Sequence, residues 1–141
     1  MTVVEKKYSN AIIYRIDTID GLYIGSTIHY QTRKAEHKHN LYNESRKDFK
    51  FQVYKNIRKN NGIYVISIYK PYPCNNSIEL RKEERRVADE LKSNLNTYKP
   101  YVSIQERKKI KKLRSISYYN ENRELLKEKQ RQHRAKKKLL T

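Results

Sequence analysis

The sequence predicts a small α+β domain followed by a basic helical extension. Three observations support this. An Asp20-Gly21 pair separates two short runs rich in β-formers, apolar residues recur at helical spacing further along the chain, and lysine and arginine become dense after residue 100. The chain of 141 residues has room for one hydrophobic core and not for two. We therefore expect a globular domain at 1–100 and an arm at 101–141 that is helical or partly disordered.

The charge of the chain points to a polyanionic partner. Lysine and arginine number 33 against 15 acidic residues, a net charge of +18. Residues 101–141 hold 14 basic residues and 4 glutamates, a net +10, which leaves +8 for the hundred residues before them. No apolar run reaches the roughly 18 residues of a membrane span, and the start lacks a secretory segment, so we expect a soluble, intracellular protein. Cys74 stands alone, which excludes an internal disulfide or a thiolate zinc cage.

The domain begins with a predicted antiparallel hairpin. Its strands are Ala11–Ile16 and Leu22–Gly25, and Asp-Gly between apolar runs is a strong tight-turn signal because glycine accepts positive φ. Side chains alternate along a strand, so Tyr14 shares a face with its neighbours two residues away, and it can meet Tyr23 across the pair. The alternative is that both are ordinary sheet residues, the default for any one of 13 tyrosines.

A helix is predicted next, from about Tyr30 to Leu41. Steps of three and four residues place two polar side chains on one stripe with two less polar ones: Tyr30, Arg33, His37 and Leu41. An arginine there can donate a fixed fork of hydrogen bonds to a phosphate, and a histidine one turn later can donate to the same group or accept a proton. The alternative is a solvated basic helix, because Lys34, Lys38 and His39 lie on it too.

Another helix and a third strand follow. Phe49, Val53 and Ile57 indicate a helix that Asn61-Gly62 ends. The run from Ile63 to Tyr69 is almost continuously apolar, which predicts a strand buried on both faces.

The last helix of the domain carries two adjacent glutamates. Asn76 opens it, with Glu79 three residues later as in a capping box, and its apolar positions are Leu80, Val87 and Leu91. At about 100° per residue, Glu84 lies about 30° from the centre of that face and Glu83 about 70° away, so we expect Glu84 to point inward. A buried carboxylate needs a partner, which is either an arginine such as Arg33 or a metal ion. One glutamate suffices for Mg²⁺ when substrate phosphate and water supply the other ligands.

The spacing of these residues matches that of a known nuclease signature. Ile12-Ile13-Tyr14 and Tyr23-Ile24-Gly25 are followed by Arg33 eight residues after Gly25 and by His37 four residues later. Further matches are the run Phe51-Gln52-Val53-Tyr54-Lys55-Asn56-Ile57-Arg58-Lys59, then Glu84, and then Leu95-Asn96 twelve residues past it. From about Ala11 to Tyr98 the chain therefore resembles the GIY-YIG family of nucleases. It departs from the family label at Ile12, where the label has glycine.

The resemblance implies a three-stranded antiparallel sheet flanked by helices, and cleavage of DNA with one divalent metal ion, Mg²⁺ or Mn²⁺. It implies that Tyr14 is the general base toward water and that Tyr23, on the neighbouring strand, is a positioning or proton-relay residue. Arg33 would neutralise phosphoryl charge, and His37 would orient or shuttle a proton. Glu84 would hold the metal, which stabilises the leaving 3′ oxygen, and Asn96 would brace the site. The segment from Tyr98 to Arg134 looks like the extensions of family members encoded by large DNA viruses.

Basic residues outside the signature are candidates for binding the DNA backbone. Those we expect to bind are Lys34, Lys38, Arg107, Lys108, Lys109, Lys111, Lys112, Arg114, Arg131, Arg134, Lys136, Lys137 and Lys138. The alternative function is a non-catalytic nucleic-acid-binding protein in which the arm binds and the domain is a scaffold. Cutting both strands with one site per chain requires either a homodimer or two successive nicks.

Overall fold

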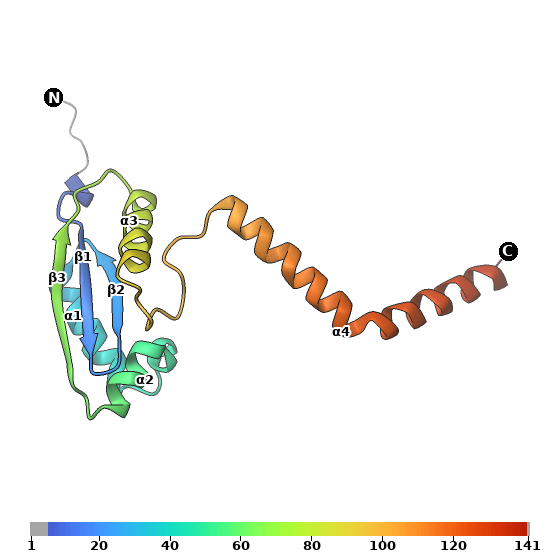
Figure 1. Ribbon diagram of the computed structural model, residues 1–141, viewed down its shortest axis with the longest axis horizontal. Helices are drawn as coiled ribbons and strands as arrows, with labels where there is room; N and C mark the ends of the chain where they lie inside the picture. Colours follow the sequence, from blue (N-terminus) through green and yellow to red (C-terminus); the bar gives the residue numbers. More distant parts are fainter. Residues whose placement is uncertain (1–5, 141) are drawn as a thin grey trace. The chain divides into compact units, whose positions relative to one another are not determined.

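A computed structural model, described here for residues 6–140, confirms the α+β fold (Figure 1). Three strands form one antiparallel sheet in the order β2-β1-β3. Their bounds are Ile12–Thr18 for β1, Leu22–Thr27 for β2 and Tyr64–Pro71 for β3.

Helices cover both faces of this sheet. The α-helices of the domain are α1 (Tyr30–Tyr42), α2 (Gln52–Lys59) and α3 (Ser77–Glu90), with short 3₁₀ helices η1 (Lys6–Tyr8) and η2 (Lys47–Lys50). The Asn76 side chain accepts a hydrogen bond from the Glu79 backbone N–H, as the capping sequence predicts. Phe49, which we expected in the second helix, lies in η2 instead.

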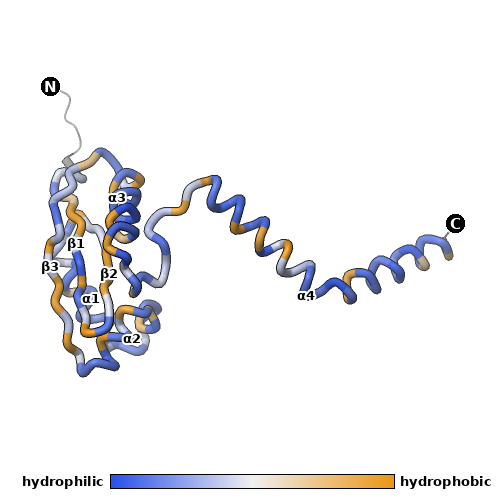
Figure 2. Tube along the Cα trace, in the orientation of Figure 1, coloured by the Kyte–Doolittle hydropathy of each residue, from blue (hydrophilic) through white to orange (hydrophobic). Residues whose placement is uncertain are grey.

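Each face of the sheet has its own hydrophobic core. Beneath α1 and α2, Tyr14 and Ile16 of β1 pack with Leu41, Val53, Tyr54, Ile57 and Leu95. Beneath α3, Ile13 of β1 and Ile24 of β2 pack with Ala11, Leu80, Val87 and Ala88. Figure 2 shows the corresponding apolar stretches along the strands. The alternation of β1 thus places Tyr14 and Ile16 on one face, as predicted.

The hairpin register brings the two tyrosines of the signature together. Tyr14 lies opposite Gly25 and Ile16 lies opposite Tyr23, so Tyr14 and Tyr23 are diagonal neighbours on one face. Their ring centroids are 6.2 Å apart. A Cβ atom on Gly25 would stand 2.4 Å from the Tyr14 ring, so only glycine lets this ring lie against β2.

The prediction that the third strand is buried on both faces is wrong. β3 is an edge strand, and Val65 and Ile68 are 62% and 51% exposed. The central strand is β1, whose Ile13, Tyr14 and Ile16 are fully buried. A continuous apolar run does not reveal which strand the helices cover, and here α3 packs on β2 rather than on β3.

The free edge of β2 is closed by the segment that follows α3. The Asn94 side chain accepts from the backbone N–H of Leu22 at 2.9 Å. The Asn96 amide accepts from the N–H of Ile24 at 3.1 Å and donates to its carbonyl at 2.7 Å. These bonds satisfy backbone groups that an edge strand would otherwise leave unpaired.

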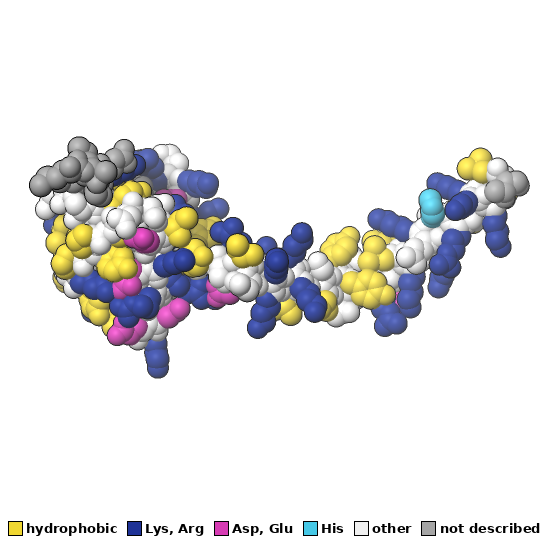
Figure 3. Space-filling view, turned by 90° about the horizontal axis from the view of Figure 1, so that it is seen from above, with side chains coloured by type: hydrophobic (Ala, Val, Ile, Leu, Met, Phe, Trp, Pro, Cys, Tyr) yellow, Lys and Arg dark blue, Asp and Glu magenta, His cyan; other side chains and the backbone are white. Residues whose placement is uncertain are grey.

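Beyond Tyr101 the chain forms a second compact unit, Val102–Thr141, built on the helix α4 (Ile104–Leu139). Ser103 and Glu106 form a capping box at its start. None of the 36 residues of α4 is buried, and lysine and arginine project from it along its length (Figure 3). Within residues 6–140, no helix has the length and apolarity needed to cross a membrane.

Candidate functional site

The Tyr14 hydroxyl is the centre of a buried polar cluster between β1, β2 and α1. Tyr14 is fully buried, and its Oη lies 2.6 Å from Nε2 of His37. His37 is itself buried, and its Nδ1 lies 2.7 Å from the Tyr54 hydroxyl on α2. The stripe of α1 predicted from the sequence therefore turns His37 inward, onto the face of β1 that carries Tyr14.

Arg33 connects this cluster to the surface. Its Nε donates to the Tyr14 hydroxyl at 3.3 Å, and its Nη1 pairs with Glu36 at 3.0 Å. The Arg33 side chain is 43% exposed and lines a pocket of about 350 Å³. The other residues of the pocket wall are Glu36, Asn40, Arg46, Lys47 and Asp48. The guanidinium can thus meet an anion from outside while Nε contacts the buried phenol.

Burial controls the protonation of the two tyrosines. It raises the pKa of Tyr14 to about 12, although the charge of Arg33 and hydrogen bonds from Arg33 and Tyr23 act in the opposite direction. Burial also raises the pKa of Tyr23 well above its ordinary value, and the charges of Tyr14 and Glu84 add to this effect. Both hydroxyls therefore keep their protons at neutral pH.

His37 is the neutral member of the cluster. Burial and the nearby Arg33 charge lower the pKa of His37 to about 4. At neutral pH the ring therefore carries one proton, and one ring nitrogen is free to accept another.

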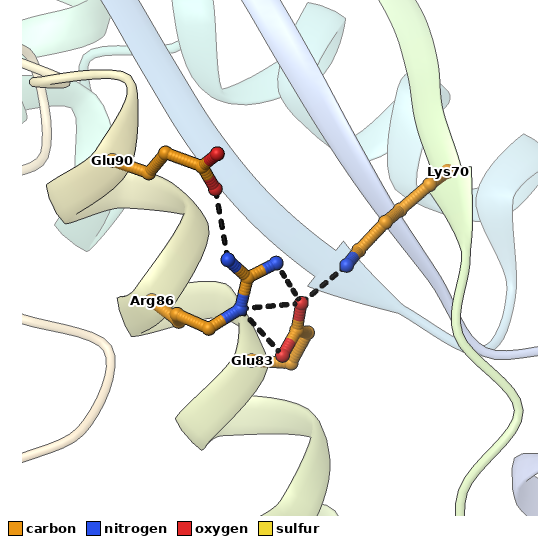
Figure 4. Close-up of polar contacts among 4 residues, drawn as sticks. All are labelled: Lys70, Glu83, Arg86 and Glu90. Atoms are coloured by element: carbon orange, nitrogen blue, oxygen red, sulfur yellow. Dashed lines mark hydrogen bonds and ion pairs between the residues drawn. The ribbon is translucent and has the colours of Figure 1, made fainter.

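Glu83, and not only Glu84, faces the sheet. Glu83 is 9% exposed and lies on the buried side of α3, where the sequence placed Glu84 alone. It pairs with Lys70 of β3 and with Arg86, as Figure 4 shows. The bonds from Arg86 and from Lys70 lower the pKa of Glu83 to about 2. The prediction that Glu83 points away from the buried face is wrong. The buried face of α3 is centred nearer Glu83 than its apolar positions alone suggest. Lys70 and Arg86 compensate the charge of the buried carboxylate.

Glu84 has a different environment one residue further along α3. Its Oε2 accepts a 2.5 Å hydrogen bond from the Ser26 hydroxyl of β2, and burial raises the pKa of Glu84 to about 7. Ser26 points to the α3 face of β2, whereas Tyr23 points to the other face, so Glu84 and the two tyrosines lie on opposite faces of the sheet. The charge of Glu84 raises the pKa of Tyr14 and Tyr23.

A metal ion would find one carboxylate here rather than a cage. Among residues 6–140, no group of three His, Cys, Asp or Glu side chains could hold an ion. The Glu84 carboxylate and the Ser26 hydroxyl are hard oxygen donors, and in the described part of the chain Glu84 has no ion-pair partner. This donor set fits Mg²⁺ or Mn²⁺, which keep several waters and take further oxygens from a phosphate.

The remaining predicted residues lie outside this cluster. Asn96 bonds the backbone of Ile24 on β2, so it braces the strand next to Tyr23. On α1, Lys38 is exposed and Lys34 lies over the Tyr30 ring at 5.3 Å. The other eleven basic residues expected to bind nucleic acid are exposed on α4, in the second unit.

Sequence reasoning missed three residues that contact the Tyr14 cluster or Glu84. Ser26 follows directly after Gly25, Asn40 lies one turn after His37 at the protein surface, and Tyr54 belongs to a run that we matched but did not interpret. Tyr54 carried a signal, because its spacing from Val53 and Ile57 places it beside the buried face of α2.

Comparisons with known proteins leave the family open. No protein-family model matches the chain, and neither the curated proteins nor the solved structures contain a match to it.

Proposed function

We propose that this protein is a metal-dependent endonuclease of the GIY-YIG type that hydrolyses DNA phosphodiester bonds. One observation carries the proposal: the Tyr14 hydroxyl contacts the neutral His37 at 2.6 Å and the charged Arg33 at 3.3 Å, with the Glu84 carboxylate close enough to influence its pKa. A proton acceptor and a phosphate-binding cation thereby contact one phenol, and Glu84 on the Ser26 side of β2 adds a hard metal ligand.

The proton of the attacking water passes to Tyr14 in this mechanism. As the water oxygen bonds to phosphorus, Tyr14 Oη takes its proton and passes its own proton to Nε2 of His37. The bond from phosphorus to the 3′ oxygen breaks, and that oxygen is protonated by solvent. The pKa of Tyr14, about 12, excludes a tyrosinate formed in advance at neutral pH, so the transfer to His37 has to accompany the attack.

Arg33 has a second task besides binding phosphate. It covers Tyr14, which is fully buried, so the guanidinium must turn outward before water reaches the hydroxyl. Its pair with Glu36 joins two side chains that are 43% and 47% exposed, and such a pair is worth about 0–1 kcal/mol. A substrate phosphate can displace Glu36, and the same movement uncovers Tyr14.

Glu84 and Ser26 are the residues that would hold the metal ion. The ion would supply charge neutralisation at the leaving 3′ oxygen. The carboxylate must be ionised to bind it, and the pKa of Glu84, about 7, makes that ionisation sensitive to pH near neutrality.

The helix α4 is the proposed DNA-binding arm. Residues 104–114 carry six basic residues and one glutamate, and residues 127–140 carry seven and one. Between them, residues 115–126 hold one arginine and two glutamates, so two cationic segments flank a nearly neutral one. Phosphate contacts from both segments would release counterions and would hold the domain on DNA without reading sequence.

The burial of Tyr14 favours a second candidate, a non-catalytic nucleic-acid-binding protein. A phenol with no exposed surface and a pKa of about 12 can also be a satisfied core group, since Arg33 and His37 complete its hydrogen bonds. In that case α4 binds and the domain only supports it.

Plasmid nicking separates the two candidates. Supercoiled plasmid is incubated with the full chain in Mg²⁺, in Mn²⁺ or in EDTA, and relaxed and linear products are measured. We expect relaxation that requires the metal and that Glu84→Gln abolishes, whereas Glu83→Gln, the matched control on the same helix, keeps it. Binding without cleavage in either metal would establish the second candidate instead.

The order of the products addresses the homodimer. One site per chain cuts one strand, so linear product formed together with relaxed product indicates two copies acting in concert, and linear product formed only later indicates successive nicks. Sedimentation of the protein with and without a short duplex measures the number of copies directly.

A further inference from the structure

His37 has a second hydrogen-bond partner on α2. Its Nδ1 lies 2.7 Å from the Tyr54 hydroxyl, and the Asn40 amide donates to that same hydroxyl at 3.5 Å. Tyr54 is 3% exposed, and its ring stacks on Phe51 with 4° between the planes. A buried ring that is held from two sides keeps its hydroxyl at a fixed position beside His37.

Donor and acceptor roles around Tyr14 can be counted. A phenol oxygen accepts at most two hydrogen bonds and donates one. The Arg33 guanidinium can only donate, and it does so at 3.3 Å. That bond uses one acceptor position, and in the proposed mechanism the Tyr14 proton points to Nε2 of His37, at 2.6 Å.

This direction of the Tyr14 proton determines the tautomer of the imidazole. If Nε2 accepts from Tyr14, the single ring proton of neutral His37 is on Nδ1, and Nδ1–H donates to Tyr54. We infer that Tyr54 is a positioning residue that holds His37 in its Nδ1–H tautomer, with Asn40 in turn orienting Tyr54. This inference rests on the proposed function, in which Nε2 receives the Tyr14 proton, and the tautomer is measured separately from cleavage.

The tautomer of His37 decides whether Nε2 can receive a proton from Tyr14. With the proton on Nδ1, Nε2 presents a lone pair to Tyr14 and can receive its proton; with the proton on Nε2, that nitrogen would donate to Tyr14 and could receive nothing. The charged groups that act on the ring are Arg33, which can only donate, and Glu36, which accepts from Arg33.

The tautomer can be measured without any activity assay. Two-bond ¹H–¹⁵N correlation spectra of the ¹⁵N-labelled full chain distinguish protonated from bare ring nitrogens. We expect His37 to show Nδ1–H in the wild type. In Tyr54→Phe the Nδ1–H loses its acceptor, so the population should shift to Nε2–H, and cleavage should fall about 10- to 100-fold.

Two further variants control this experiment. Tyr64→Phe removes a hydroxyl from a tyrosine that packs against the same core from β3, and it should leave the tautomer and the cleavage rate unchanged. Asn40→Ser removes the amide that donates to Tyr54 and should shift the tautomer in the same direction as Tyr54→Phe by a smaller amount. Asn40 is partly exposed, so this variant tests the inference even if Tyr54→Phe fails to fold.

The outcomes separate the inference from the proposed function. Nε2–H in the wild type, or an unchanged tautomer in both Tyr54→Phe and Asn40→Ser, would overturn the positioning role of Tyr54. A shifted tautomer together with reduced cleavage supports it. A shifted tautomer in a protein that cuts no DNA in Mg²⁺ or Mn²⁺ supports the positioning of His37 and overturns the endonuclease.

Discussion

The two units of the chain use polar side chains in opposite ways. In the unit that ends at Tyr101, two hydrophobic cores enclose Tyr14 and His37 and move their pKa values to about 12 and about 4. In α4 no residue is buried, and the charges remain in solvent. Proton transfer requires groups whose protonation the protein controls, whereas phosphate binding requires charges that reach outward. In the proposed function, the first unit supplies the chemistry and the second supplies the affinity.

Removing α4 tests this assignment with a large effect on binding. Deletion after Tyr101 takes away a net charge of +10, the balance of 14 basic residues and 4 glutamates. If about half of the basic residues contact phosphates, affinity should fall about 100-fold or more at physiological salt, and the slope of log K against log salt should fall by about six. Fluorescence anisotropy on a duplex at several salt concentrations measures both.

The same deletion should leave the chemistry in place. At enzyme concentrations that saturate the DNA, the truncated protein should still cut in Mg²⁺, because the Tyr14 cluster lies wholly in the first unit. Circular dichroism establishes that it is folded. A folded but inert truncated protein would show that α4 belongs to the active unit and would break the comparison.

The pH dependence of cleavage comes from the first unit alone. Ionised Glu84 is needed to bind the metal, and burial raises the pKa of Glu84 to about 7. The single-turnover rate at subsaturating Mg²⁺ should therefore rise about tenfold per pH unit below 7 and level off above it, and more Mg²⁺ should move the midpoint to lower pH. A rate that keeps rising tenfold per unit to pH 9 would mean that Tyr14 must ionise first, which contradicts transfer to His37.

Adjacent glutamates should affect stability with opposite signs. Above pH 4.5 the ionised Glu83 stabilises the fold, because its folded pKa of about 2 lies below the ordinary value, and this contribution disappears as the pH falls to 2. The folded pKa of Glu84, about 7, lies above the ordinary value, so its ionised form costs stability above pH 7, and the cost is absent below about 4.5.

Urea unfolding at pH 8 and at acid pH checks both signs. At pH 8, Glu83→Gln should lower the free energy of unfolding by about 1–2 kcal/mol, and Glu84→Gln should raise it by about 1 kcal/mol. Both differences should shrink toward zero at low pH, for Glu84 by about pH 4.5 and for Glu83 only near pH 2. If Glu83→Gln and Glu84→Gln changed the free energy of unfolding in the same direction at pH 8, the two carboxylates would not have different environments.

Much of the fold could be predicted because its signals are local. Asp20-Gly21 between β-formers determines the hairpin, and Asn76 with Glu79 determines where α3 begins. The position of β3 at the edge could not be predicted, because it depends on which strands the helices cover. Glu83 was misplaced for a similar reason: an apolar face does not show that Lys70, on a distant strand, compensates a buried carboxylate.

The candidate site was predictable in part. Spacing predicted that Tyr14 can meet Tyr23 across the hairpin and that His37 lies one turn after Arg33, and the structure brings these residues together. Their protonation was not predictable, because burial sets it and burial is a property of the assembled core. The contact from Tyr54 to His37 depends on how α2 docks against α1, which no local pattern specifies.

A double-variant cycle tests the central claim most directly. Tyr14→Phe, Glu84→Gln and the double variant are compared with the wild type for single-turnover cleavage of a duplex in Mg²⁺, with Tyr64→Phe as the matched control. We predict that each single change lowers the rate about 10²- to 10⁴-fold and that the double variant is no slower than the slower single one, because both residues serve one transition state. Two effects that multiply, or a Tyr14→Phe protein as fast as wild type, would contradict a single site to which both Tyr14 and Glu84 belong.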